Sequence, residues 1–415
     1  MLAQLRNPPG GRDARIMLRA LAVDRTGTGL WAASSVLYLT FVTHLSAQQI
    51  GVLLGTAGVA GIAGSPLAGR LASRFPVRPL LIGCHLLRLV TLTLVLLCTR
   101  FEALLVVVAV TYLGDRAAKT LEMLFATRAA GERRAAYQAL SRSAANAGYG
   151  LGAGLAAIGL AAGTADAYRA LILGNALSFL VAAALVWRTG EPGGAVKAAR
   201  SGAGPSSATS PWRDRGYLRF VLLDIPMNLD DSVLGVGLPL WLVTRTSAPH
   251  ALVPAFLVIN TVLVVLLQLT VSRRAEGPRG ATRAVLLYGV LLFATCALLA
   301  ASTGCGTWAA AGALLAAAVL VTTAELMRSV SSWELAVLLA PPDERAAYLG
   351  VAGMSQSIQK SAGPPLLTGV VMAAGPGGWL ALGVAVAGLA VWQRRGCERR
   401  LRATGSLDAV AARVG

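Results

Sequence analysis

Four charged residues lie close together near the end of a long apolar run, in the stretch TYLGDRAAKTLEMLFATR (residues 111–128). Asp115, Lys119 and Glu122 fall at i, i+4 and i+7, so a helix would place them in one stripe, with Arg116 about 100° away. Acids and bases at this spacing either form a ladder of ion pairs or leave a carboxylate able to bind and release a proton. Asp115 lies deepest among these acids, so we take it as a proton-coupling candidate and Arg116 as a charge partner.

A second group of acids lies in the stretch FVLLDIPMNLDDSVLGVGLPLWLV. Pro226 and the glycines that follow weaken a helix here, and an interrupted helix in an apolar segment frees backbone groups that can contact a ligand. Asp230 and Asp231 are adjacent, and neighbouring carboxylates repel when both are ionised. Either is a candidate for proton coupling, although Asp231 has the alternative of pairing with a base from another helix. Asn228 is a candidate for the substrate cavity.

Isolated charged residues occur in other apolar runs. Arg88, in CHLLRLV, would be unfavourable against lipid, so we expect it to face a cavity or to neutralise Asp115. Glu325 and Arg328 are three residues apart on one expected helix, which makes Glu325 a further proton-coupling candidate and Arg328 its expected partner. For all these residues the structural alternative is an ion pair that only holds two helices together.

Polar and aromatic side chains accompany these charges. The stretch MSQSIQKSAGPP places Gln356, Gln359 and Lys360 in a polar helical stripe, so the glutamines are candidates for substrate contacts and Lys360 for a charge partner. Trp31 is a candidate for stacking on a flat substrate. The 5 cysteines show no metal-ligand spacing, and we expect neither a metal nor a cofactor.

The chain that must position these residues is 55% apolar and only 13% charged, with a mean hydropathy of +0.64. Apolar runs of about 20 residues recur throughout, and each could cross a hydrocarbon layer of roughly 30 Å as a helix. The sequence therefore predicts an all-α integral membrane protein with twelve transmembrane helices. The expected spans are 18–43, 47–68, 79–99, 103–125, 137–163, 167–187, 217–243, 251–271, 283–302, 307–334, 346–374 and 377–393.

The placement of the basic residues decides what the net charge of +18 means. With the N-terminus inside, the inner loops hold nearly all the bases outside the spans, and the outer loops hold only Arg100, Arg169 and Arg245. This asymmetry is typical of membrane proteins, whose cytoplasmic loops are rich in Lys and Arg. It predicts that both termini are cytoplasmic and argues against nucleic-acid binding. The dominance of arginine over lysine suggests a GC-rich bacterial source, and hence the bacterial plasma membrane.

The chain is expected to divide into two six-helix halves, residues 1–189 and 215–393. Between them, residues 190–214 are rich in Gly, Ser, Pro and Ala and form an expected cytoplasmic linker, while residues 394–415 form a cytoplasmic tail.

Two short matches relate the halves to each other. ERRAAYQAL opens the fifth span and DERAAYLGV opens the eleventh, which aligns Arg134 with Arg345. LASRF and TVSRR occupy the corresponding loops after the second and eighth spans. These matches in corresponding loops predict a duplicated six-helix unit.

Twelve helices in two parallel repeats resemble the major facilitator superfamily, over the whole chain. The best-known motif of that family is Gly-x-x-x-Asp-Arg/Lys-x-Gly-Arg/Lys-Arg/Lys. Here GRLASRFPVR has a serine in place of the acid and a proline in place of the second glycine. The resemblance implies a cytoplasmic gate formed by the motif and its counterparts in the second half. We assign to this gate Gly69, Ser73, Arg74, Arg78, Arg134, Ser272, Arg273 and Arg345.

Looser similarities, in DRTGTGLW, GLPLWLV and GPPLLTG, resemble the actinobacterial drug or natural-product exporters of the superfamily. The antiporter signature of the fifth helix is represented by NAGYGLGAG, without its proline. The resemblance implies a secondary transporter that exports a small organic molecule against inward proton flow, working as a monomer in the lipid bilayer.

Two alternatives remain open: a proton-coupled importer of a metabolite or sugar, and a transporter-like sensor or scaffold. The sequence contains no Gly-x-x-x-x-Gly-Lys-Ser/Thr loop, which argues against an ATP-driven pump. It also shows no nucleophile-base-acid set that would indicate an enzyme.

Overall fold

The computed structural model describes residues 8–161, 164–191, 210–249 and 252–403. Within these ranges the chain is helical and contains no strand, and each of the twelve expected spans is found as a helix or as a series of helical pieces, which confirms the all-α fold. The first six are α2 (Gly11–Phe41), α3 (Ala47–Ala72), α4 (Val77–Leu97), α5 (Phe101–Ala130), α6 (Arg134–Ala161) and α7 (Ala165–Trp187).

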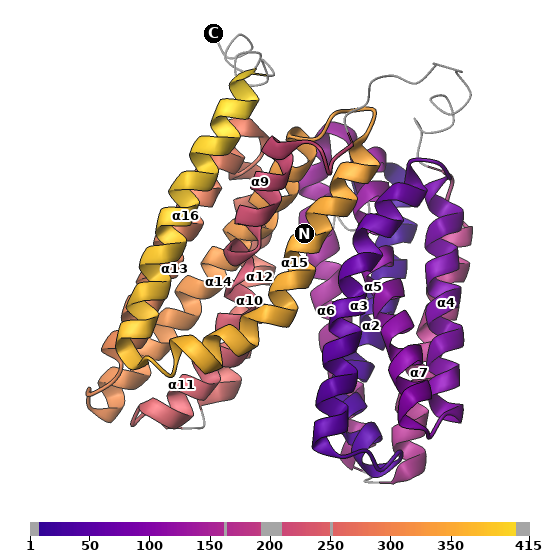
Figure 1. The fold of residues 1–415 in the computed structure, drawn as a ribbon, viewed down its shortest axis with the longest axis horizontal. Coiled ribbons are helices and arrows are strands. Elements are labelled where there is room, and N and C mark those ends of the chain that lie inside the picture. The colour runs from indigo at the N-terminus through magenta and orange to yellow at the C-terminus, as the bar shows by residue number, and fades with distance from the viewer. Residues whose placement is uncertain (1–7, 162–163, 192–209, 250–251, 404–415) are drawn as a thin grey trace. The chain divides into compact units, whose positions relative to one another are not determined.

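The seventh span is interrupted, as expected from its prolines and glycines (Figure 1). It consists of α9 (Arg215–Asp224), a 3₁₀ turn (Pro226–Asn228), α10 (Asp230–Ser232), a π-helical turn (Val233–Gly237) and α11 (Leu238–Arg245). The remaining helices are α12 (Val253–Arg274), α13 (Gly277–Ala301), α14 (Thr307–Leu338), α15 (Arg345–Leu366) and α16 (Gly375–Ala403). After Pro364 and Pro365, α15 continues into a π-helical turn, Leu367–Val371.

Seven of the helices in the described part of the chain are long and apolar enough to cross a membrane, by length and composition. Candidates of the sequence analysis lie on both groups of helices. Asp115, Asp230 and Lys360 lie on the remaining spans, whereas Arg88 and Glu325 lie on α4 and α14, which are among the seven.

The helix that was expected to end at residue 393 extends to Ala403, into the predicted tail. Arg394 and Glu398 form an i, i+4 ion pair of 2.7 Å along this extension, and Arg400 forms two hydrogen bonds of 2.6 Å to Asp214, just before α9. These polar contacts stabilise the extension, together with the burial of Cys397 and Leu401 along it. Residues 192–209 of the expected linker and 404–415 of the tail lie outside the described residues.

The described chain forms two compact units. Unit 1 comprises Met1–Ala208 with Asp343–Ser357, and unit 2 comprises Thr209–Pro342 with Ile358–Gly415. In unit 1, α3 packs along α5, α2 packs against α6 and α7, and α4 packs against α5 and α7. In unit 2, α13 packs against α14 and α16, and α12 packs against α14.

Glycines of the expected antiporter signature bring α6 close to α2. A Cβ atom on Gly148 would lie 2.3 Å from the carbonyl oxygen of Ala22, and one on Gly152 would lie 2.0 Å from that of Thr26. Only glycine allows the two backbones to approach this closely. The contact holds α2 in place, and α2 carries the acid at the centre of the site described next.

Candidate functional site

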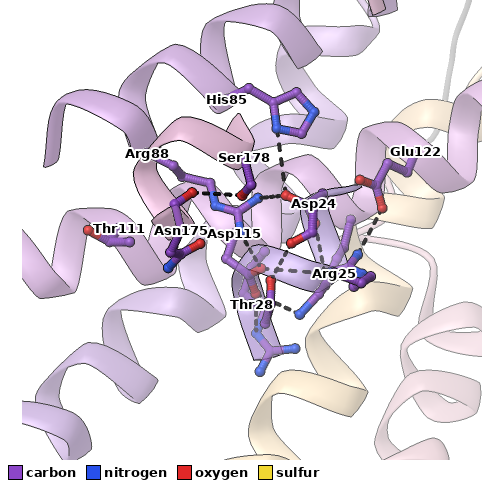
Figure 2. A network of polar contacts seen from close by, with 12 residues as sticks. Asp24, Arg25, Thr28, His85, Arg88, Thr111, Asp115, Glu122, Asn175 and Ser178 are labelled. Atoms are coloured by element: carbon purple, nitrogen blue, oxygen red, sulfur yellow. Dashed lines mark hydrogen bonds and ion pairs between the residues drawn. The ribbon is translucent and has the colours of Figure 1, made fainter. Parts of the chain in front are cut away.

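The most buried charged contacts of unit 1 centre on Arg88 of α4 (Figure 2). Its Nη1 lies 2.5 Å from Asp24 Oδ1 on α2, and its Nη2 donates to Asp115 Oδ1 on α5 at 3.2 Å. The Asp24 side chain is fully buried and that of Arg88 is 3% exposed. One guanidinium therefore bridges two carboxylates and connects three helices.

Further cations surround Asp115. Lys119 Nζ donates to Asp115 Oδ2 at 2.6 Å, Arg25 Nη1 lies 3.7 Å from Oδ1, and Arg116 Nε lies 4.0 Å from Oδ2. Arg25 also donates to Glu122 Oε2 at 2.9 Å. This bond connects α2 to the C-terminal end of the stripe of charged residues on α5.

The acid and base stripe of α5 is thus part of a network of three carboxylates and four cations. The carboxylates are Asp24, Asp115 and Glu122, and the cations are Arg25, Arg88, Arg116 and Lys119.

The walls of this network combine an aromatic ring with polar groups. The Arg88 guanidinium carbon lies 3.8 Å from the centre of the Phe179 ring, and the His85 ring stacks on the same ring with their centres 6.4 Å apart. His85 Nδ1 is 3.7 Å from Asp24 Oδ1. Asn175 Oδ1 is buried and accepts no hydrogen bond from any described residue, so it could accept one from a bound molecule.

Unit 2 contains a second buried polar cluster, around Asp224 at the end of α9. Arg328 of α14 forms an ion pair with Asp224, Gln393 of α16 donates to Oδ1 at 3.1 Å, and Ser332 donates to Oδ2 at 3.2 Å. Asn228 donates to the Asp224 carbonyl oxygen at 2.6 Å and accepts from Arg328 Nε at 3.4 Å. Asn228, a substrate-cavity candidate, therefore belongs to a network that joins three helices.

This cluster corrects the partner expected for Arg328. The sequence pairs it with Glu325, three residues earlier on α14, but the ion pair is with Asp224. Glu325 instead accepts a hydrogen bond of 2.6 Å from Asn260 on α12. Spacing along one helix did not decide the partner, because Asp224 of α9 lies next to Arg328 and the amide of Asn260 on α12 lies next to Glu325.

The adjacent acids of the interrupted span lie in different surroundings. Asp230 is buried and accepts a hydrogen bond of 3.1 Å from the Tyr288 hydroxyl, whereas the Asp231 side chain is 57% exposed and lies 3.2 Å from Lys360 Nζ. Gln359 donates to Ser232 at 2.7 Å. Lys360 therefore forms an ion pair with an acid of the seventh span.

The other two cavity candidates do not line these clusters. Trp31 is 8% exposed and packs in an apolar core with Tyr38, Ile172 and Phe179. Gln356 is exposed, whereas Gln359, three residues later on α15, is buried.

The gate candidates lie at helix ends of their respective units. Arg134 and Arg345 are the first residues of α6 and α15. A Cβ atom on Gly69 of α3 would lie 2.6 Å from the carbonyl oxygen of Ala346, so this glycine is in close contact with the start of α15. Ser73 caps the end of α3 and donates to the Arg70 carbonyl oxygen at 2.7 Å.

The remaining gate candidates differ in exposure. Arg78 donates to the carbonyl oxygen of Trp187. Arg74 is exposed in the loop after α3, and Arg273 is exposed in the last turn of α12. Ser272 is buried and accepts a hydrogen bond from Gln268 at 3.5 Å.

Sequence reasoning left out of the site the two acids that anchor these clusters, Asp24 and Asp224. They occupy similar positions in the first and seventh spans, separated by almost the same number of residues as Ser73 and Ser272 of the repeated loop. The repeat could have identified them.

A third residue was also missed, because Glu191 lies in the expected linker. Its carboxylate accepts backbone hydrogen bonds of 2.7 and 2.9 Å from Val77 and Arg78 at the start of α4. No sequence signal pointed to this contact between distant segments.

With this arrangement in view, comparison with models of protein families gives a match over residues 21–364 to the model described as Major Facilitator Superfamily. The chain belongs to the Major Facilitator Superfamily. Comparison with curated protein sequences gave no match.

Solved structures of superfamily transporters share the fold. A bacterial homologue of the iron transporter ferroportin, in an outward-facing state, matches 94% of this chain and 99% of its own at 15% identity, with a TM-score of 0.72. The human organic anion transporter MFSD10 matches over 94% and 100% at 16% identity and a TM-score of 0.68. The proton:xylose symporter XylE matches over 92% and 95% at 14% identity and a TM-score of 0.69.

Identities this low establish the fold and leave the substrate open. Membership of the Major Facilitator Superfamily indicates a multi-pass membrane transporter rather than an enzyme. Among the described residues, no group of three or more His, Cys, Asp or Glu side chains is arranged to hold a metal ion.

Proposed function

We propose that this transporter exports a small amphipathic organic molecule from a bacterial cell in exchange for protons, with both termini in the cytoplasm. The proposed proton coupling rests on one observation: Asp115 on α5 and the fully buried Asp24 of α2 both contact Arg88 of α4. A carboxylate held by a cation that has a second partner can change protonation without leaving that cation unpaired.

The proposed exchange uses these two partners. In the ionised state Asp115 holds both Arg88 and Lys119. When it binds a proton, its charge is lost and the attraction to both cations weakens, because an opposite charge favours the ionised form of a carboxyl group. Arg88 then remains on Asp24. The ion pair between Arg88 of α4 and Asp115 of α5 therefore weakens when Asp115 binds a proton. In this way proton binding can favour one conformation over another.

The seventh span supplies alternative proton sites. Asp230 is buried and accepts a hydrogen bond from a neutral hydroxyl group, that of Tyr288. Asp231 is paired with Lys360 in a more open setting. Glu325, hydrogen-bonded to Asn260, is a fourth candidate. The π-helical turn that follows Asp231 supports this role, since such turns occur frequently at functional sites.

We place the substrate contacts on polar side chains near these acids and the gate on the basic loops. Gln359 Oε1 is buried and accepts no hydrogen bond from a described residue. At the gate, Gly69 permits the close approach of α3 to the start of α15. Arg74 and Arg273 are exposed at the ends of α3 and α12, which correspond in the two halves. The direction of transport rests on the sequence resemblance to exporters.

The test uses inverted membrane vesicles, in which export appears as uptake. A panel of amphipathic dyes and antibiotics is first screened for uptake that requires an imposed pH gradient. With the best compound, Asp115→Asn and Asp230→Asn are each expected to abolish gradient-driven uptake while they retain expression and binding. Asp231→Asn is the alternative to Asp230→Asn. Asp166→Asn is the matched control, because Asp166 is 91% exposed and bonded only locally to Arg169 at 3.1 Å.

Three results would contradict the proposal. If all three variants accumulate the compound as the unmodified protein does, the coupling acids are wrongly assigned. If uptake occurs only in right-side-out vesicles, the protein is an importer, and if no compound moves in either orientation, the sensor or scaffold alternative gains support.

A further inference from the structure

A basic cavity lies at the start of α2, outside the ion-pair network. It has a volume of about 310 Å³ and is lined by residues of α2 and by the end of α7: Arg12, Arg15, Ile16, Arg19, Leu185 and Arg188. Four of its six lining residues are arginines, and none of the six is acidic. Such a site attracts an anion.

The sequence and fold place the cavity at the boundary of the membrane. Arg12, Arg15 and Arg19 lie at i, i+3 and i+7 of α2, which puts them on one face of the helix, and Arg188 follows the last residue of α7. The expected apolar span begins only at residue 18, so the cavity surrounds the entry of α2 into the bilayer. The charge asymmetry of the loops assigns this end to the cytoplasmic side.

A local hydrogen bond fixes the two walls of the cavity relative to each other. Asp13, in the first turn of α2, accepts a hydrogen bond of 3.1 Å from the backbone N–H of Gly190, just after α7. Asp13 is not among the lining residues, and the lining holds four arginines and no acidic residue, so basic charge dominates the cavity.

We propose that this cavity binds the phosphodiester headgroup of an anionic phospholipid of the cytoplasmic leaflet. Guanidinium groups bind phosphate oxygens in a bidentate manner. Basic cavities between transmembrane helices on the cytoplasmic side suit anionic headgroups, and each basic residue near the surface strengthens attraction about fivefold. Ile16 and Leu185 provide the apolar wall that a glycerol backbone requires and a free phosphate ion does not. The bound lipid joins α2 to α7 at their cytoplasmic ends.

The test measures lipid binding to the purified, delipidated full-length protein. A fluorescent phosphatidylglycerol is titrated in detergent, with phosphatidylcholine as the uncharged comparison. The unmodified protein is expected to bind phosphatidylglycerol at least tenfold more tightly than phosphatidylcholine. The double variant Arg12→Gln/Arg188→Gln, which removes one exposed guanidinium from each wall, is expected to weaken phosphatidylglycerol binding at least tenfold.

The matched control is Arg399→Gln/Arg402→Gln, which removes the same charge from exposed positions of α16. It should change the affinity by less than twofold. Arg12→Lys/Arg188→Lys keeps the charge but loses bidentate geometry, so it should bind with intermediate affinity. Gel filtration verifies that each variant is folded. If the double glutamine variant does not fold, lipid binding is measured with Arg12→Lys/Arg188→Lys and with Arg12→Gln alone.

Three outcomes would overturn the assignment. Equal losses in the two glutamine double variants would show that only the net charge matters. Unchanged binding in Arg12→Gln/Arg188→Gln would place the lipid elsewhere. Full displacement of phosphatidylglycerol by millimolar inorganic phosphate would identify the cavity as a site for a soluble anion.

Discussion

The aspartates of this transporter differ most in how deeply they are buried. Asp24 and its partner Arg88 have side chains that are 0% and 3% exposed, whereas Asp231 and Lys360 are 57% and 39% exposed. An ion pair with water access contributes little to stability. Removal of one partner from a buried pair leaves an uncompensated charge in a medium that solvates it poorly.

We therefore expect Asp24→Asn to destabilise the protein by about 3 kcal/mol or more, since Arg88 would keep only Asp115 as an anionic partner. Asp231→Asn, the same chemical change in the open pair, should lower the free energy of unfolding by less than about 1 kcal/mol. Thermal unfolding in detergent, followed by tryptophan fluorescence, measures both. Equal midpoints for the two variants would show that the Asp24–Arg88 contact contributes nothing beyond a surface pair.

At the scale of elements, the start of α4 depends on a residue far away in the sequence. Pro76, which precedes the helix, offers no side-chain cap, and the first backbone N–H groups of Val77 and Arg78 donate to Glu191. Arg128, near the end of α5, lies 3.9 Å from the same carboxylate. In the family motif an acid precedes this helix, and here Ser73 stands in that position. Glu191, which follows the last helix of the first six-helix half, supplies a carboxylate to this loop.

Glu191→Ala should therefore destabilise the protein by about 1 to 2 kcal/mol, as expected for the loss of a helix cap. Glu191→Gln should retain part of this contribution, because its amide oxygen can still accept one hydrogen bond. Glu398→Ala is the control: its i, i+4 pair with Arg394 on α16 should contribute about 0.5 kcal/mol or less. If the midpoints of thermal unfolding for Glu191→Ala and Glu398→Ala coincide, Glu191 does not act as a cap.

At the scale of the whole molecule, the distribution of basic residues predicts the orientation. Arg200→Cys in the linker and Gly405→Cys in the tail should be labelled by a membrane-impermeant maleimide only after the cells are opened. Cys305, exposed between α13 and α14, lies at the end predicted to face outward and should be labelled in intact cells. The other native cysteines, Cys84, Cys98, Cys296 and Cys397, are replaced with alanine beforehand.

The native Cys305 serves as an internal control. Each labelled chain then carries one cysteine expected outside, Cys305, and one expected in the cytoplasm, at residue 200 or 405. Labelling of residue 200 or 405 in intact cells would overturn the arrangement of two six-helix halves with a cytoplasmic linker. Protection of Cys305 in intact cells, with labelling only after opening, would reverse the whole topology.

Local sequence determined the helices. Apolar runs long enough to span a bilayer predict helices because a backbone in lipid must satisfy its own hydrogen bonds. The interruption of the seventh span was equally local, since Pro226 lacks a backbone N–H and the following glycines lose more entropy on ordering. The extension of α16 to Ala403 was not predicted, since it depends on Arg400 reaching Asp214 far away in the chain.

Partner choice was decided by the tertiary structure. The spacing of Asp115 and Lys119 on one helix predicted their contact, which is 2.6 Å, because both lie on the same face. Spacing could not predict that Arg88 pairs with Asp24. Nor could it predict that Arg328 pairs with Asp224 and not with Glu325, or that Glu191 caps α4. Each of these contacts joins segments that are distant in the sequence. Sequence patterns encode which residues share a helix face, but only the packing of helices brings a given acid and base within a few ångströms, where their charges can compensate the loss of water.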